Sequence, residues 1–102
     1  MVLMLVFAHF VCDFALQSDR MALEKQPGRD QTLPWGWWLT AHGATHGMAV
    51  AWISGWPLLG LLEAMAHALI DWCKGRWRWS MVVDQSLHLG CKLVWVSLWL
   101  HG

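Results

Sequence analysis

Four pairs of polar side chains, each with a spacing of four residues, interrupt otherwise apolar stretches of the sequence. Every pair consists of a histidine with an aspartate or of two histidines: His9 and Asp13, His42 and His46, His67 and Asp71, and Asp84 and His88. Residues four positions apart lie one turn apart on the same face of a helix. Each pair therefore predicts a helix that directs two ligand-type side chains toward one neighbour.

Imidazole nitrogens and carboxylate oxygens are the usual ligands of Zn²⁺, Mn²⁺ and Fe²⁺. Eight such groups are more than one tetrahedral ion can use. We therefore expect two divalent transition-metal ions bridged by a carboxylate, as in dinuclear sites at the core of helical bundles. Zinc is the first expectation, and manganese or iron would suit the same ligands. A buried Asp–His hydrogen bond would explain any single pair, and a proton relay inside a membrane would use the same residue types.

The four pairs are expected at one level of the bundle. In the first and third apolar stretches the pair lies near the end, and in the second and fourth it lies near the start. Because a helix rises about 1.5 Å per residue and successive helices run antiparallel, the pairs then meet in one layer. This arrangement predicts one shared site in place of four separate ones.

Three further side chains are expected to hydrogen-bond to the ligands or to contact a substrate: Gln17, Lys74 and Gln85. Gln17 follows Asp13 by one turn and Gln85 is next to Asp84, so both could orient a ligand. Lys74, at the end of the third stretch, would bind a phosphate or a lipid head group. A helix-end amide and a lysine that extends to a membrane interface are the simpler explanations of the same residues.

The elements that must position these residues are unusually apolar. The chain has 102 residues, which suits one domain, and it is 57% hydrophobic and 14% charged, with ten Trp and no Tyr. Soluble domains carry about 25% charged residues, and a chain this short buries little of its apolar surface by itself. We expect an all-α, four-helix transmembrane bundle over residues 1–102, with helices at about 1–17, 37–56, 57–73 and 81–100. A soluble, tryptophan-rich bundle that packs as an oligomer is the alternative.

Two loops carry the basic residues that would orient such a bundle. They are Arg20, Lys25 and Arg29 beside a Pro27–Gly28 turn, and Lys74, Arg76 and Arg78. By the positive-inside rule both loops face the cytoplasm, which puts both termini on the opposite side of the bilayer. Acidic and basic residues balance at seven each, which gives no sign of nucleic-acid binding. The small size is compatible with a homo-oligomer.

The polar residues form an ordered set of motifs: HFVCDFALQ at residues 9–17, HGATH at 42–46, HALIDWCK at 67–74 and DQSLH at 84–88. Taken together, these motifs resemble the domain of unknown function 3307 family over nearly the whole chain. The resemblance implies a small multi-pass protein of the bacterial inner membrane, from a bacterium or a phage. With the topology above, both termini are periplasmic. The pattern is also similar to that of small membrane-bound metal-dependent hydrolases, by analogy alone.

Two hypotheses of different classes follow. In the first, the eight ligands hold two ions that hydrolyse a phosphoester or acyl bond of a membrane-associated lipid or lipid phosphate. The sequence has no GxSxG nucleophile motif, so no further catalytic residue is assigned. In the second, the metal holds the helices together and the protein binds another membrane protein without catalysis. An open coordination position would indicate the enzyme, whereas a closed site would indicate the structural role.

Overall fold

Helices make up all of the regular structure in residues 1–18, 21, 23, 25 and 34–102, which are the residues that the computed structural model describes. The elements are α1 (Val2–Phe10), the π-helix η1 (Val11–Ala15), α3 (Trp35–Ser54), α4 (Pro57–Trp77) and α5 (Met81–His101). The predicted all-α class with four helices is thereby confirmed for this part of the chain. Arg20, Arg29 and the predicted Pro27–Gly28 turn lie outside the described residues.

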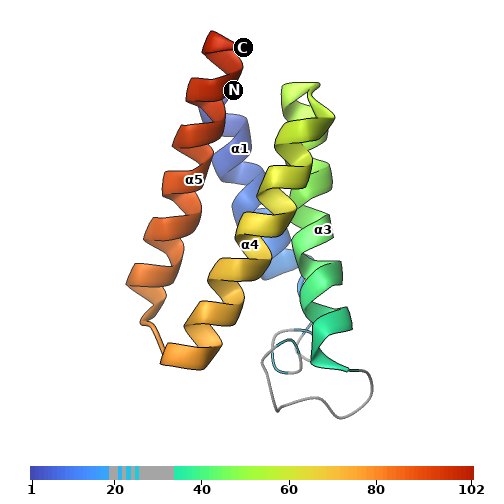
Figure 1. Cartoon of the computed structure of the whole chain (residues 1–102), viewed down its shortest axis with the longest axis vertical. Coiled ribbons are helices and arrows are strands. Elements are labelled where there is room, and N and C mark those ends of the chain that lie inside the picture. Colours follow the sequence, from blue (N-terminus) through green and yellow to red (C-terminus); the bar gives the residue numbers. More distant parts are fainter. Residues whose placement is uncertain (19–20, 22, 24, 26–33) are drawn as a thin grey trace.

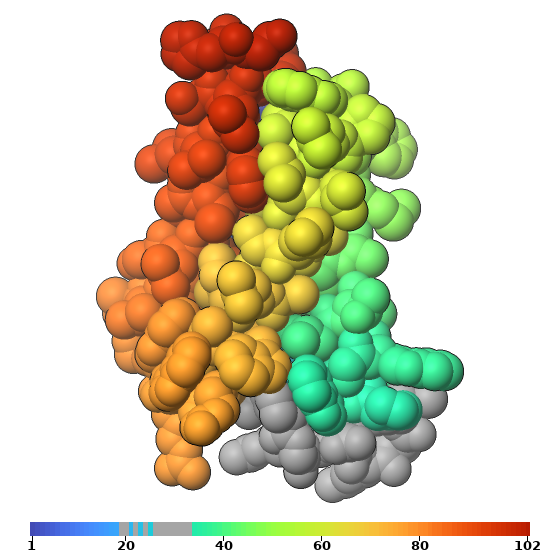
Figure 2. All heavy atoms as spheres, in the orientation of Figure 1, coloured from blue at the N-terminus to red at the C-terminus, as the bar shows by residue number. Residues whose placement is uncertain are grey.

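The four helices form a bundle that brings both termini to one end (Figure 1). In this view α4 lies between α3 and α5, and α1 lies behind it. Successive helices α3, α4 and α5 run in alternating directions. The space-filling view shows side chains of all three in contact along this face (Figure 2). Every helix can therefore contribute side chains to a shared interior.

Local sequence explains where the last three helices begin and end. Gly55 closes α3 with φ of 69°, a left-handed conformation that glycine adopts at little cost. Pro57 lies in the first turn of α4, where its missing N–H has no helical partner to lose. Ser80 caps α5, because its Oγ accepts a hydrogen bond from the N–H of Val83 at 3.2 Å. These signals keep the connections from α3 to α4 and from α4 to α5 short.

α3 and α4 approach each other more closely than larger side chains would allow. A Cβ added at Gly47 would lie 2.6 Å from the carbonyl oxygen of Gly60 and 2.9 Å from the Cβ of Ala64. One added at Gly43 would lie 2.9 Å from the carbonyl oxygen of Ala64. Small residues at such positions let two helix backbones pack together. Because Gly43 and Gly47 flank His46, this close packing also sets how near the ligands of α3 and α4 lie to one another.

The first helix departs from the expected regular helix over residues 1–17. The N–H of Leu16 donates to the carbonyl of Val11 at 2.8 Å, five residues back, so the turn is wider than an α-turn. The side-chain Nε2 of Gln17 then donates to the carbonyl of Asp13 at 2.9 Å and satisfies a backbone acceptor at the helix end. Single π-turns of this kind are frequent at functional sites.

The distribution of polarity is unusual, since the interior is largely polar and the exterior largely apolar. The buried apolar cluster consists of Leu5, Val50, Leu59 and Trp95. Large apolar side chains face outward on every helix, and the most exposed of them, Trp52, is 88% exposed. Among the described residues, no helix combines the length and the apolar character that crossing a membrane requires. The predicted transmembrane character therefore stays a prediction.

Candidate metal centre

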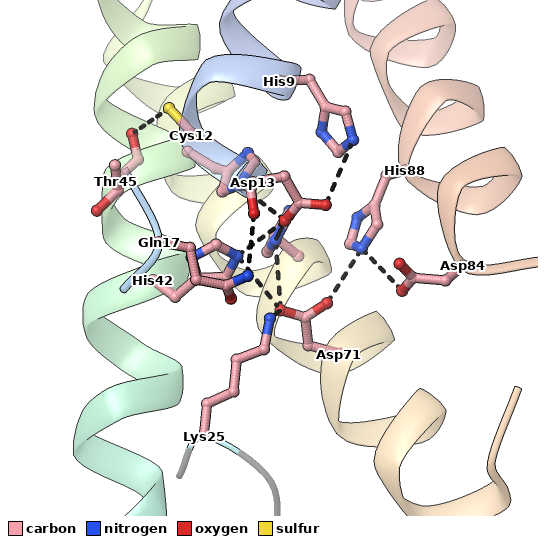
Figure 3. Close-up of polar contacts among 12 residues, drawn as sticks. His9, Cys12, Asp13, Gln17, Lys25, His42, Thr45, Asp71, Asp84 and His88 are labelled. Atoms are coloured by element: carbon pink, nitrogen blue, oxygen red, sulfur yellow. Dashed lines mark hydrogen bonds and ion pairs between the residues drawn. The ribbon is translucent and has the colours of Figure 1, made fainter. Parts of the chain in front are cut away.

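All eight predicted ligands lie in one buried layer, toward the end of the bundle where α4 connects to α5. Each is at most 6% exposed: His9, Asp13, His42, His46, His67, Asp71, Asp84 and His88. The segment α1–η1 and the helices α3, α4 and α5 each contribute one pair, because the four-residue spacing keeps both members on the inner face of their helix. The close-up shows His88 directed at Asp71 and Asp84, and Asp13 beside His42 (Figure 3).

Four of these residues form a group that could hold one metal ion: Asp13, His42, His46 and His67. The Oδ1 atom of Asp13 lies 3.0 Å from Nε2 of His42, 3.5 Å from Nε2 of His46 and 3.6 Å from Nε2 of His67. Ligands about 2.0–2.1 Å from a tetrahedral Zn²⁺ lie roughly 3.3 Å from one another. These three separations are close to those between ligands of a tetrahedral ion.

A second group that could hold an ion consists of His67, Asp71 and His88. Nε2 of His88 lies 3.1 Å from Oδ1 of Asp71 and 3.2 Å from Oδ1 of Asp84. Asp84 thus adjoins this group although it is not part of it. His67 belongs to both groups, since its Nε2 is also 3.4 Å from Oδ2 of Asp71.

Asp13 and Asp71 each direct their two oxygens at different neighbours. Oδ2 of Asp71 faces His67 and, at 3.6 Å, Nε2 of His42, whereas its Oδ1 faces His88. Asp13 directs Oδ1 at the first group and Oδ2 toward Nε2 of His9, at 3.8 Å. The oxygens of Asp71 thus face ligands of both groups, which is the arrangement of a metal bridge, whereas Asp13 faces the first group and His9, which belongs to neither.

Several ligand atoms have no hydrogen-bond partner within the described part of the chain. They include Nε2 of His46, Nε2 of His67 and Oδ1 of Asp84, all three buried. Buried polar atoms are almost always paired, and an unpaired one calls for an explanation such as an ion. The imidazole ring of His67 stacks between those of His46 and His88, with centroids 3.6 and 4.0 Å away. A bound ion would account for these unpaired atoms.

The three expected auxiliary residues lie at the site but play different parts. Gln85 donates to Oδ2 of Asp13 at 2.8 Å and to Oδ2 of Asp84 at 3.1 Å, and its Oε1 lies 2.7 Å from Nε2 of His9. It therefore orients two candidate ligands and occupies the Nε2 of a third. Gln17 contacts the backbone of Asp13, so it supports the π-turn and not the carboxylate.

Two lysines approach the centre from the side of the loops. Lys25 donates to Oδ2 of Asp71 at 2.8 Å, as Figure 3 shows, and Lys74 donates to Oδ2 of Asp84 at 3.4 Å. Each ammonium group thus neighbours one buried carboxylate, that of Asp71 or that of Asp84. The third buried carboxylate, that of Asp13, faces imidazoles and the amide of Gln85.

The sequence interpretation missed Glu63, which is 1% exposed and lies one turn before His67 on α4. It binds Lys92 and Trp95 of α5. The four-residue spacing could have identified Glu63 in the sequence. Glu63, His67 and Asp71 lie along one face of α4, and Asp84, His88 and Lys92 lie along one face of α5. Lys92 is 1% exposed and faces the interior.

Comparison with known proteins identifies a family but no function. No curated protein and no solved structure matches the chain. The family model described as "Protein of unknown function (DUF3307)" matches residues 1–101, which include all four helices and every candidate ligand. The chain therefore belongs to the DUF3307 family, as the four motifs indicated.

Proposed function

We propose that this protein is a membrane-associated hydrolase that uses two divalent transition-metal ions, with zinc as the first candidate, on a lipid or lipid-phosphate substrate. The observation that carries the proposal is the carboxylate of Asp71, whose Oδ1 faces His88 and whose Oδ2 faces His67 and His42. An ion would also account for the Nε2 atoms of His46 and His67, which have no hydrogen-bond partner within the described residues.

The ligands divide naturally between two positions. The first ion would take Asp13, His42, His46 and His67, and the second would take Asp71, His88 and the adjoining Asp84. When bound, such ions polarise a phosphoryl or acyl oxygen and activate water for attack. Gln85 holds the carboxylates of Asp13 and Asp84 in place for this task.

An anionic substrate suits the lysines beside the site. The side chain of Lys74 is 32% exposed and its contact with Asp84 is long, at 3.4 Å. Once divalent ions neutralise the aspartates, Lys74 and Lys25 are free to bind the phosphate of a head group. The chemistry therefore favours a phosphate ester over a neutral substrate.

The apolar exterior supports a location in the lipid bilayer. Trp52, Met48 and Val82 are 88, 72 and 75% exposed. Met48 and Trp52 lie one turn apart on α3, and Val82 lies on α5. Contact with lipid would cover apolar side chains of this kind. The buried histidines and aspartates face the bundle interior, as polar groups of membrane proteins do. Trp37 and Trp77, both largely exposed at the end that carries the site, suit a bilayer interface there.

Metal analysis tests the proposal directly. The protein is purified without a polyhistidine tag and its metals are measured by inductively coupled plasma mass spectrometry, beside His42→Ala/Asp84→Ala. About two equivalents of one transition metal are expected in the wild type and fewer in the variant. His101→Ala is the matched control, because His101 is exposed at the end of α5 and outside both ligand groups.

The metal-loaded protein is then incubated with phosphatidic acid and a polyprenyl phosphate in mixed micelles. Release of inorganic phosphate that is lost in Asp84→Ala supports the enzyme. No metal, even after reconstitution with Zn²⁺, Mn²⁺ and Fe²⁺, would refute the metal centre and leave a hydrogen-bonded polar layer. Two tightly bound ions without hydrolysis of any lipid would refute the catalytic part and indicate a closed structural site.

A further inference from the structure

A second buried cluster adjoins the metal centre one helical turn away. The carboxylate of Glu63 accepts hydrogen bonds from Nζ of Lys92 and, at 2.6 Å, from Nε1 of Trp95. Glu63 and Lys92 are each 1% exposed. The Oε1 atom that binds Lys92 also lies 3.4 Å from Nδ1 of His67. The cluster therefore meets the centre at one atom, the Nδ1 of His67.

His67 is the most constrained of the candidate ligands. It is common to both ligand groups, and its ring is stacked on both faces by His46 and His88. Its Nε2 faces the carboxylates of Asp13 and Asp71 at 3.6 and 3.4 Å. A neutral imidazole carries its proton on one nitrogen and a lone pair on the other. Nε2 can bind a metal only when the proton is on Nδ1.

The only carboxylate that the described residues place beside that Nδ1 is the one of Glu63. A carboxylate next to Nδ1 favours the Nδ1-protonated tautomer, because it accepts that proton in a hydrogen bond. The present separation of 3.4 Å is long for such a bond. A small rotation of the His67 ring would change the distance between its Nδ1 and Oε1 of Glu63. The hydrogen bond that selects the tautomer therefore also depends on the orientation of the ring.

We propose that Glu63 is a positioning residue for the metal centre: it holds His67 with its proton on Nδ1 and its Nε2 directed at the ion. The inference rests on the proposed metal-binding function and deepens it. Lys92 supplies the counter-charge for the Glu63 carboxylate, and Trp95 holds its second oxygen. Carboxylates that orient a metal-binding histidine in this way also raise its basicity as a ligand.

A purely structural role for Glu63 would be to pair with Lys92 and join α4 to α5. Both roles predict that Glu63→Leu alone damages the protein, because it leaves the buried ammonium of Lys92 unpaired. The double variant Glu63→Leu/Lys92→Met separates the two roles. It removes both charges, so most of the lost stability returns although Nε1 of Trp95 still lacks its acceptor, but it does not restore an acceptor for Nδ1 of His67.

The experiment measures zinc affinity by competition with a chromophoric chelator, and the visible absorption of the Co²⁺-loaded protein. The double variant should retain helical circular dichroism and denature at a midpoint closer to that of the wild type than Glu63→Leu alone. Its zinc affinity should fall by about 10–100-fold, with an altered Co²⁺ spectrum. In addition, long-range ¹H–¹⁵N spectra of the zinc-loaded wild type should show a proton on Nδ1 of His67.

Each result decides a different point. A folded double variant that binds zinc as tightly as the wild type, with the same Co²⁺ spectrum, overturns the positioning role. Coordination through Nδ1 of His67 in the wild-type spectrum overturns it as well, whether or not the variant folds. If the wild type itself takes up no metal, the proposed function fails and this inference fails with it.

Discussion

Replacing Gly47 with alanine tests whether the close packing of α3 on α4 positions the metal ligands. The new Cβ would lie 2.6 Å from the carbonyl oxygen of Gly60 and 2.9 Å from the Cβ of Ala64. Comfortable carbon contacts are about 3.5–4.0 Å. Neither neighbour is the end of a flexible side chain, so the helices must separate. Overpacking of this kind costs about 1–3 kcal/mol.

Alanine also has a higher helix propensity than glycine, by about 1 kcal/mol. Gly47→Ala should therefore lower the free energy of unfolding by up to about 2 kcal/mol net. Gly90→Ala on α5 is the matched control, because an added Cβ there meets nothing within 4 Å. It should raise the free energy of unfolding by about 1 kcal/mol. The difference between the two variants isolates packing, since the propensity gain is common to both.

Unfolding is followed by circular dichroism during denaturant titration, in the detergent used for purification, and zinc affinity is measured on the same samples. Gly47 directly follows His46, whose ring stacks on that of His67 across the α3–α4 interface at 3.6 Å. Separation of the helices should therefore weaken zinc binding in Gly47→Ala and leave Gly90→Ala unaffected. Equal stability and equal zinc affinity in the two variants would refute the argument.

Three further predictions concern the site and its surroundings. Asp71→Asn should lower the metal content from about two equivalents to about one, because the two oxygens of Asp71 face both ligand groups. Elemental analysis that finds two ions in this variant would exclude a bridge at Asp71. Lys74→Ala should raise the KM for a lipid phosphate more than it lowers kcat, whereas an unchanged KM would remove Lys74 from substrate binding. Brominated phospholipids should quench tryptophan fluorescence in reconstituted vesicles, and Trp52→Phe should reduce that quenching because Trp52 is 88% exposed; no quenching in the wild type would count against a bilayer location.

The candidate ligands could be predicted because their arrangement follows from local helix geometry. A four-residue spacing fixes the face of each helix, and the position of a pair within its apolar stretch fixes its depth. All eight side chains are accordingly buried in one layer. That metal ions occupy the layer is a separate prediction, which metal analysis must test.

The contacts between helices were harder to predict, because they depend on partners far apart in the sequence. Glu63 is a lone carboxylate in an apolar stretch, and its partners Lys92 and Trp95 are about thirty positions away. The π-turn at residues 11–15 has no compositional signal, since it differs from an α-turn only in which carbonyl the N–H of Leu16 selects. The contact of Lys25 with Asp71 depends on a loop whose path no periodicity specifies.

The membership of His67 in both ligand groups makes the binding of the two ions interdependent. One nitrogen coordinates one ion, so the ion that takes Nε2 of His67 gains a ligand that the other then lacks. The first ion also fixes the carboxylate of Asp71 that the second must use. If two ions bind, each changes the affinity for the other by the same factor. Competition for Nε2 of His67 would make the second ion bind more weakly, so the singly loaded state would fill first and the doubly loaded form would accumulate gradually as free metal rises.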